Sequence, residues 1–184
     1  MAATLSILGI PGSLRKASWN KSLLKAAVAL APAGAKIEIF ELDGIPQFNQ
    51  DDERSPPPRV TELKSKAKAA DAILFVTPEY NYSIPGVLKN AIDWASRPYG
   101  DSAWGGKPVA IMGASGGNIG TARAQYHLRQ TFVFLDMDPV NQPEVMLNAT
   151  KSLDDQGNLT DEKAKELIGK LLEKLVEKAK SRKA

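Results

Sequence analysis

The sequence of 184 residues contains no cysteine, a single histidine (His127) and only short apolar runs. Without cysteine it can form neither a disulfide nor a cysteine-based nucleophile or metal site. One histidine cannot build a histidine-cluster zinc site, and it argues against a Ser-His-Asp triad. The apolar runs are shorter than a membrane helix, and the N-terminal segment lacks the basic region of a signal peptide. We therefore expect a cytoplasmic protein with no membrane partner.

Charges of the two signs nearly balance, with 24 Lys+Arg against 21 Asp+Glu and a formal net charge of +3. Many of the basic residues lie near the C-terminus, where lysines alternate with glutamates. This pattern favours a solvated helix face over a nucleic-acid stripe, so no nucleic-acid partner is expected. The hydrophobic share of 43% is ordinary for globular proteins, and the length predicts one domain covering residues 1–184.

Short apolar runs alternate with longer segments of helical period along the chain. Several runs are almost continuously apolar, as in parallel strands covered on both faces. The alternation predicts an α/β fold: a flavodoxin-like three-layer sandwich whose five parallel strands have the order 2-1-3-4-5. The predicted strands are Leu5–Ile10, Lys36–Phe40, Ala72–Thr77, Pro108–Met112 and a weaker Asp138–Val140, and the predicted helices between them are Trp19–Ala31, Pro58–Ala70, Ile84–Ser96 and Ile119–Phe134.

Two further segments have distinctive patterns. A last helix is expected after Thr160, its predicted N-cap, because apolar residues recur at helical spacing from Ala164 to Val176. The segment Asp43–Pro58 combines acidic residues with three consecutive prolines and predicts a long surface loop. Such a loop can be a lid, an interface element or inert.

The loop after the first predicted strand opens directly into a helix, whose N-terminus favours a phosphate group. Ser13, Ser18, Asn20 and Ser22 add neutral donors, and Arg15 adds a charged one. The loop matches neither Gly-x-Gly-x-x-Gly nor a Walker A motif, which favours a monophosphate over a pyrophosphate or triphosphate. The alternative is an ordinary capped turn with Ser18 as its N-cap.

The loops after the third and fourth predicted strands suit the rest of such a ligand. Tyr80, Asn81 and Tyr82 lie on a proline-bracketed loop that would suit a planar heterocycle, although a buried aromatic turn with Trp94 in the core is an alternative. The glycine-rich residues 113–120 could bring backbone amides to a developing anion. Together the three loops match the phosphate, the flat tricycle and the pyrimidine edge of FMN.

The same stretches resemble the NADPH-dependent FMN reductase family, whose members include quinone, azo and chromate reductases. The resemblance extends from the first strand through the fourth helix, and its run Pro78–Trp94 is highly specific. The other matching stretches are Gly12–Asn20, Trp104–Pro108, and Gly116 and Gly117 with Ala122, Leu128 and Arg129.

The resemblance implies an FMN-dependent NAD(P)H oxidoreductase with NADPH or NADH as electron donor. Its acceptors would be quinones, azo compounds, chromate-like oxyanions or flavin, reduced by ping-pong hydride transfer through flavin N5, so no catalytic side chain is required. It also implies a homodimer or homotetramer with the flavin near a subunit interface. The implied ligands of the phosphate and ribityl chain are Ser13, Leu14, Arg15, Ser18, Trp19 and Asn20; those of the isoalloxazine are Pro78, Glu79, Tyr80, Asn81 and Tyr82; and those of its other edge are Ser115, Gly116 and Gly117.

Two side chains have competing interpretations. Glu79 could donate a proton, but we expect this loop carboxylate to be solvated or hydrogen-bonded to nearby amides. His127 falls in the fourth predicted helix, where surface or interface packing is expected, and Arg123, Tyr126 and Arg129 on that helix are candidates for an oligomer contact.

Two other functions stay open for the whole chain. One is a flavodoxin-type FMN electron carrier serving protein partners, although carriers of that type are acidic and this chain has a pI near 9.0. The other is a flavin-free nucleotide-binding or sensory domain on the same fold.

Overall fold

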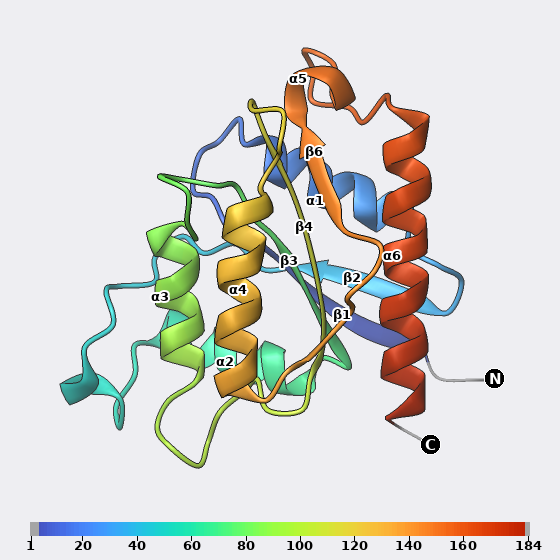
Figure 1. The fold of residues 1–184 in the computed structure, drawn as a ribbon. Helices are drawn as coiled ribbons and strands as arrows, with labels where there is room; N and C mark the ends of the chain where they lie inside the picture. The colour runs from blue at the N-terminus through green and yellow to red at the C-terminus, as the bar shows by residue number, and fades with distance from the viewer. Residues whose placement is uncertain (1–3, 183–184) are drawn as a thin grey trace.

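The computed structural model describes residues 4–182, so Met1–Ala3, Lys183 and Ala184 lie outside the described residues. A parallel sheet forms its centre, with the order β2-β1-β3-β4-β5 that the sequence predicted (Figure 1). The three middle strands are almost entirely buried, as expected for strands covered on both faces. The four longer strands are β1 (Leu5–Pro11), β2 (Ala35–Ile39), β3 (Ala72–Val76) and β4 (Pro108–Ser115).

The fifth position of the sheet is divided between two short strands. β5 (Asp138–Pro139) pairs with the beginning of β4, whereas β6 (Val145–Asn148) pairs with its end. The sequence predicted Asp138–Val140 and missed β6. Pro139 and Pro143 lack the N–H group that a continuous strand would use, which accounts for the interruption.

Helices cover the sheet on both faces. α1 (Trp19–Ala29) and α6 (Glu162–Ser181) pack on one face, while α2 (Pro58–Ala69), α3 (Gly86–Ala95) and α4 (Ala122–Leu135) pack on the other (Figure 1). Alternate side chains of the strands enter the two cores: in β3, Leu74 and Val76 face α1 and α6, whereas Ile73 and Phe75 face the other helices. The short elements are the 3₁₀ helix Gln50–Asp52 and the helix α5 (Ala149–Ser152).

The last helix begins one residue later than predicted. Its N-cap is Asp161, whose carboxylate accepts hydrogen bonds from the backbone N–H groups of Lys163 (3.0 Å) and Ala164 (3.3 Å). The predicted cap, Thr160, instead donates its hydroxyl proton to the carbonyl of Ser152 (3.4 Å). A carboxylate accepts more strongly than a hydroxyl at a helix N-terminus, which favours Asp161.

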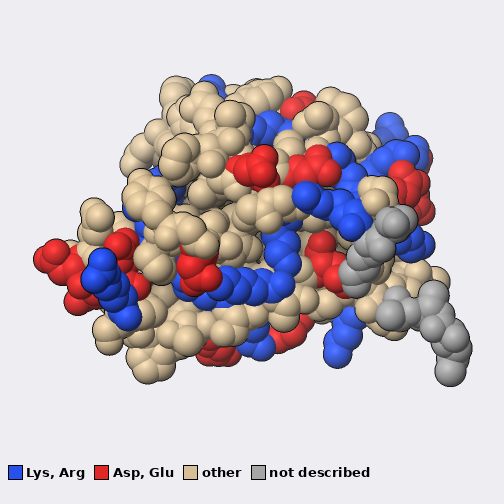
Figure 2. Space-filling view, turned by 90° about the horizontal axis from the view of Figure 1, so that it is seen from below, with Lys and Arg blue, Asp and Glu red and all other residues tan. Residues whose placement is uncertain are grey.

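Charged side chains on the surface of α6 are paired along the helix. Lys165 lies 2.7 Å from Glu162, and Lys174 lies 2.8 Å from Glu177, at spacings that place both partners on one helix face. Figure 2 shows basic and acidic side chains interspersed on the face seen from below. Among the described residues, no helix combines the length and apolarity needed to cross a bilayer.

The long loop before α2 is anchored to α3. The carbonyl of Pro46 accepts hydrogen bonds from Asn90 Nδ2 (2.8 Å) and Trp94 Nε1 (2.9 Å). The ring of Phe48 meets Trp94 edge-on with centroids 5.0 Å apart. Trp94 is fully buried, as the alternative interpretation of the next loop expected, but Tyr80 and Tyr82 of that loop are exposed, so it is not a buried aromatic turn.

The carboxylate of Asp101 joins the loop after α3 to α2, and it makes folding sensitive to acid. Its Oδ2 lies 2.9 Å from Lys64 Nζ and its Oδ1 contacts Lys68 Nζ, and these hydrogen bonds lower the pKa of Asp101 to about 2. Because that pKa is lower than in the unfolded chain, the contribution to stability is present above about pH 4 and is lost as the pH falls toward 2.

We expect Asp101→Asn to lower the urea midpoint near neutral pH. The difference from the unsubstituted protein should shrink between about pH 4 and about pH 2.5, and a constant difference would contradict this account.

Candidate functional site

The three loops singled out in the sequence meet at the carboxyl edge of β1, β3 and β4 (Figure 1). Between them lies a cleft of about 360 Å³. Ala114 lines it without having been predicted, whereas the predicted residues Leu14, Asn81, Tyr82 and Gly117 are not part of its lining. The predicted residues that do line it are Ser13, Arg15, Ser18, Trp19, Asn20, Pro78, Glu79, Tyr80, Ser115 and Gly116.

The loop after β1 presents the N-terminus of α1 to this cleft. Ser18 caps the helix, its Oγ accepting from the backbone N–H of Asn20 (3.3 Å), so the cap that the alternative interpretation of this loop expected is present. Ser13 Oγ accepts from the N–H of Arg15 (3.2 Å), which shapes the turn. The Arg15 side chain is exposed, and its guanidinium lies 5.4 Å from the centroid of Trp19. Helix amides and one arginine therefore face the same space, which suits a monophosphate.

Asn20 ties this loop to the end of β4. Its Nδ2 donates to the carbonyl of Ala114 (2.9 Å), and its Oδ1 accepts from the N–H of the same residue (2.9 Å). Asn20 is almost fully buried. Its amide therefore fixes the distance between the loop after β1 and the end of β4. The two residues are 94 positions apart, so no local sequence pattern signals this contact.

The loop after β3 forms a tight hairpin at residues 80–83. The backbone N–H of Tyr80 donates to the carbonyl of Ser83 (3.2 Å), and the N–H of Ser83 donates to the carbonyl of Tyr80 (2.9 Å). The two residues between them, Asn81 and Tyr82, both have positive φ, at 50° and 64°. Positive φ at both central residues is the geometry of a type I′ turn. The turn leaves Tyr80 and Tyr82 more than half exposed, and Tyr80 is part of the cleft lining.

Glu79 is bound to the beginning of α4. Its Oε2 accepts from the backbone N–H groups of Arg123 (2.9 Å) and Ala124 (3.1 Å), and its Oε1 lies 3.0 Å from the Arg123 guanidinium. The Glu79 side chain is only 8% exposed. A carboxylate at this place compensates the positive end of the helix. The structure thus confirms the expectation that nearby amides bind Glu79.

This arrangement predicts a cost for removing the charge of Glu79. Glu79→Gln keeps the size of the side chain but weakens its bonds to two helix amides and to Arg123. We expect the free energy of unfolding to fall by about 1–2 kcal/mol, the range for a lost helix cap or a charged hydrogen bond. Urea denaturation followed by circular dichroism measures the change, and a variant as stable as the parent would refute the capping role.

The glycine-rich loop after β4 is held by its own serine. Ser115 Oγ donates to the carbonyl of Gly120 (2.6 Å) and accepts from the N–H of Gly117 (3.2 Å). A Cβ added at Gly116 would lie 3.7 Å from the Trp19 ring, which is an ordinary contact distance. The backbone of the loop therefore lies close to the cleft and to Trp19 without a steric clash with the Trp19 ring.

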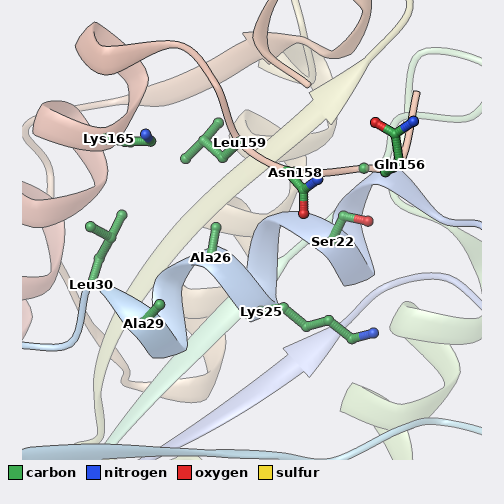
Figure 3. Close-up of a pocket in the computed structure, with 10 residues that line it drawn as sticks. Ser22, Lys25, Ala26, Ala29, Leu30, Gln156, Asn158, Leu159 and Lys165 are labelled. Atoms are coloured by element: carbon green, nitrogen blue, oxygen red, sulfur yellow. The ribbon is translucent and has the colours of Figure 1, made fainter. Parts of the chain in front are cut away.

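Two further hollows, which the sequence did not predict, continue from the cleft along α1. One of about 360 Å³ includes Arg15 and Trp19 in its lining and extends to residues 149–157. The next, of about 420 Å³, lies between α1 and the segment before α6, with Ala26, Leu30 and Leu159 at its apolar part (Figure 3). The two share Ser22, Gln156 and Gly157 in their linings.

The donor set of the cleft fits FMN. The end of α1 with Arg15 can bind a phosphate, and Tyr80 with the glycine loop can offer an aromatic side chain and backbone amides to a ring system. The fold is flavodoxin-like, and the cleft at the carboxyl edge of its sheet has groups that a flavin mononucleotide could use.

Comparison with known proteins agrees with this class. The family model for NADPH-dependent FMN reductase matches residues 5–151. NAD(P)H-dependent FMN reductase PA1204 of Pseudomonas aeruginosa is 54% identical over 177 residues, covering 95% of each chain. A 2-hydroxy-1,4-benzoquinone reductase of a Burkholderia species is 44% identical, covering 92% of this chain and 93% of its own. The structure of FerB, a flavoenzyme NAD(P)H:(acceptor) oxidoreductase from Paracoccus denitrificans, superposes with a TM-score of 0.88 at 35% identity, covering 96% of this chain and 98% of FerB.

The chain belongs to the NADPH-dependent FMN reductase family. It is accordingly an oxidoreductase with FMN as cofactor and NAD(P)H as electron donor.

Proposed function

We propose that the chain reduces small quinones with NAD(P)H in a ping-pong reaction that uses one cleft for donor and acceptor in turn. The observation that carries the proposal is the meeting of the α1 N-terminus, the exposed tyrosine hairpin and the glycine loop around one open cleft. The Burkholderia relative is named for a quinone substrate, which supports this acceptor class. Azo compounds, chromate-like oxyanions and free flavin are further acceptors that an open cleft could admit.

Each wall of the cleft has a role in the proposal. The N–H groups of α1 and the Arg15 guanidinium bind the phosphate, while Asn20 acts mainly by holding two walls together. The residues assigned to phosphate and ribityl chain are Ser13, Leu14, Arg15, Ser18, Trp19 and Asn20; those assigned to the isoalloxazine are Pro78, Glu79, Tyr80, Asn81 and Tyr82; and Ser115, Gly116 and Gly117 are assigned to its other edge.

No side chain is assigned a catalytic role. When bound, FMN supplies hydride acceptance and donation at N5, so the protein needs to place the ring and admit its partners. Glu79, the one carboxylate that the described part of the chain contributes to the cleft lining, is bound by Arg123 and the α4 amides. The side chains contribute by binding the cofactor and orienting it.

Initial-rate kinetics test the proposal. With NADPH varied at several fixed quinone concentrations, double-reciprocal plots should give parallel lines, because the donor leaves before the acceptor binds. Intersecting lines would exclude the ping-pong order. Absence of any NADPH oxidation without an added partner protein would instead favour the electron-carrier alternative.

The proposal includes a homodimer or homotetramer. Tyr126, Val133 and Phe134 lie on one face of α4 with exposed fractions of 51%, 84% and 76%. Large apolar side chains gathered on one surface mark a contact between proteins, and a second copy of this chain is the proposed partner. Sedimentation velocity on dilution tests this, since a stable monomer with full activity would remove an obligatory interface.

The proposal treats residues 1–184 as one FMN-binding domain acting in the cytoplasm, where NAD(P)H is the available reductant. The three loops that form the cleft all follow strands of the same sheet, which supports assigning the reaction to a single domain.

A further inference from the structure

The Tyr80–Ser83 hairpin is attached to α4 at both of its ends. Before the hairpin, Glu79 accepts from the first backbone amides of α4. At its end, Ser83 Oγ lies 2.9 Å from His127 Nδ1. A third contact comes from the hairpin itself, because the Arg123 guanidinium lies 3.7 Å from the centroid of the Tyr82 ring. The first two turns of α4 thus form the support for the hairpin.

The hairpin needs such support. Asn81 and Tyr82 are both in the left-handed region, which is costly for residues with a Cβ and persists where the surroundings enforce it. The hairpin is closed by only two backbone hydrogen bonds, and its two tyrosine rings are largely exposed. Its shape therefore depends on contacts made by the residues that flank the turn.

We infer that His127 is a positioning residue that holds this hairpin through Nδ1 and the Ser83 hydroxyl. In the neutral ring with its proton on Nε2, Nδ1 accepts the hydroxyl proton of Ser83. Arg123 and His127 are four positions apart on α4, so they face the hairpin from one side of the helix. His127 is not among the residues that line the cleft, and in this role it acts through Ser83. The effect of this contact on catalysis rests on the proposed function, because the hairpin includes Tyr80, which is proposed to line the flavin site.

The test compares three substitutions. Asn places an amide oxygen close to where Nδ1 of histidine lies, so His127→Asn should keep the contact, whereas His127→Leu and Ser83→Ala remove it. Hydrogen exchange of the backbone N–H groups of Tyr80 and Ser83 should be about three- to tenfold faster in the last two, the effect of one lost hydrogen bond. His127→Asn should stay within about twofold of the parent. The double variant Ser83→Ala/His127→Leu should be no faster than either single change, because both remove the same contact.

Steady-state kinetics give the second readout. We expect His127→Leu and Ser83→Ala to raise KM for quinone by a similar factor, with His127→Asn restoring the parent value. Unchanged exchange in Ser83→Ala would overturn the inference, as would a His127→Asn variant as impaired as His127→Leu. The exchange measurement needs no flavin, so a parent protein that neither binds FMN nor oxidises NADPH would refute the proposed function and leave this result interpretable.

Discussion

Replacing Arg15 by alanine is expected to weaken FMN binding by about 1.5–3 kcal/mol, or roughly 10- to 150-fold in Kd. Among residues 4–182, Arg15 is the one cationic side chain in the lining of the cleft, and it stands beside the N-terminal amides of α1. A phosphate in this position would accept a charge-assisted hydrogen bond from the guanidinium. Titration of flavin fluorescence against the apoprotein measures the change.

Two controls separate this role from a general effect of charge. Lys16 is the neighbouring exposed cation and is not part of the cleft lining, so Lys16→Ala should leave the affinity for FMN nearly unchanged. Riboflavin lacks the phosphate, so its weaker binding should be almost insensitive to Arg15→Ala. Equal losses for FMN and riboflavin would show that Arg15 acts on the ring or on the fold, and the phosphate assignment would fail.

Gly113→Ala is expected to lower the free energy of unfolding by about 3 kcal/mol, at the upper end of the usual cost of overpacking. A Cβ at this position would lie 2.2 Å from the carbonyl oxygen of Thr77 and 2.4 Å from the hydroxyl oxygen of Thr121. The first of these is buried backbone directly after the end of β3, where it cannot move aside cheaply. The substitution would push β3 and β4 apart directly beneath the cleft.

Gly169→Ala is the matched control for this prediction. Gly169 lies inside α6, and an added Cβ would have no neighbour within 4 Å. Alanine should therefore stabilise the helix by about 0.5–1 kcal/mol. Urea denaturation of the two variants should move the midpoint in opposite directions, and a Gly113→Ala protein with the stability of the parent would contradict the close approach of the two strands.

The order of the strands in the sheet could be predicted because it depends on patterns within short stretches of the sequence. Apolar runs such as Ala72–Val76 are buried on both faces, and the helices between them leave few right-handed parallel arrangements. The exception is the fifth position, where strand β6 was missed. Prolines at 139 and 143 break the apolar pattern there, and the pairing of β6 with β4 depends on a partner distant in sequence.

The three loops that form the cleft were predicted from the sequence, whereas the side-chain contacts that hold these loops in place were not. The capping role of Ser18 follows from its place before a helix, but the bonds of Asn20 to Ala114 and of Ser83 to His127 join separate parts of the chain. The hollows along α1 arise from the packing of the segment before α6 and have no signature in spacing. Long-range contacts of this kind depend on tertiary packing.

The most direct test of the account is the visible spectrum of the purified protein, recorded after saturation with FMN and removal of free flavin. It is recorded again after anaerobic NADPH and a third time after a quinone is added. We expect flavin bands that bleach with NADPH and return with the quinone. Bands that persist with both NADPH and NADH would indicate an electron carrier. A protein that retains no flavin would contradict the assignment of all three loops.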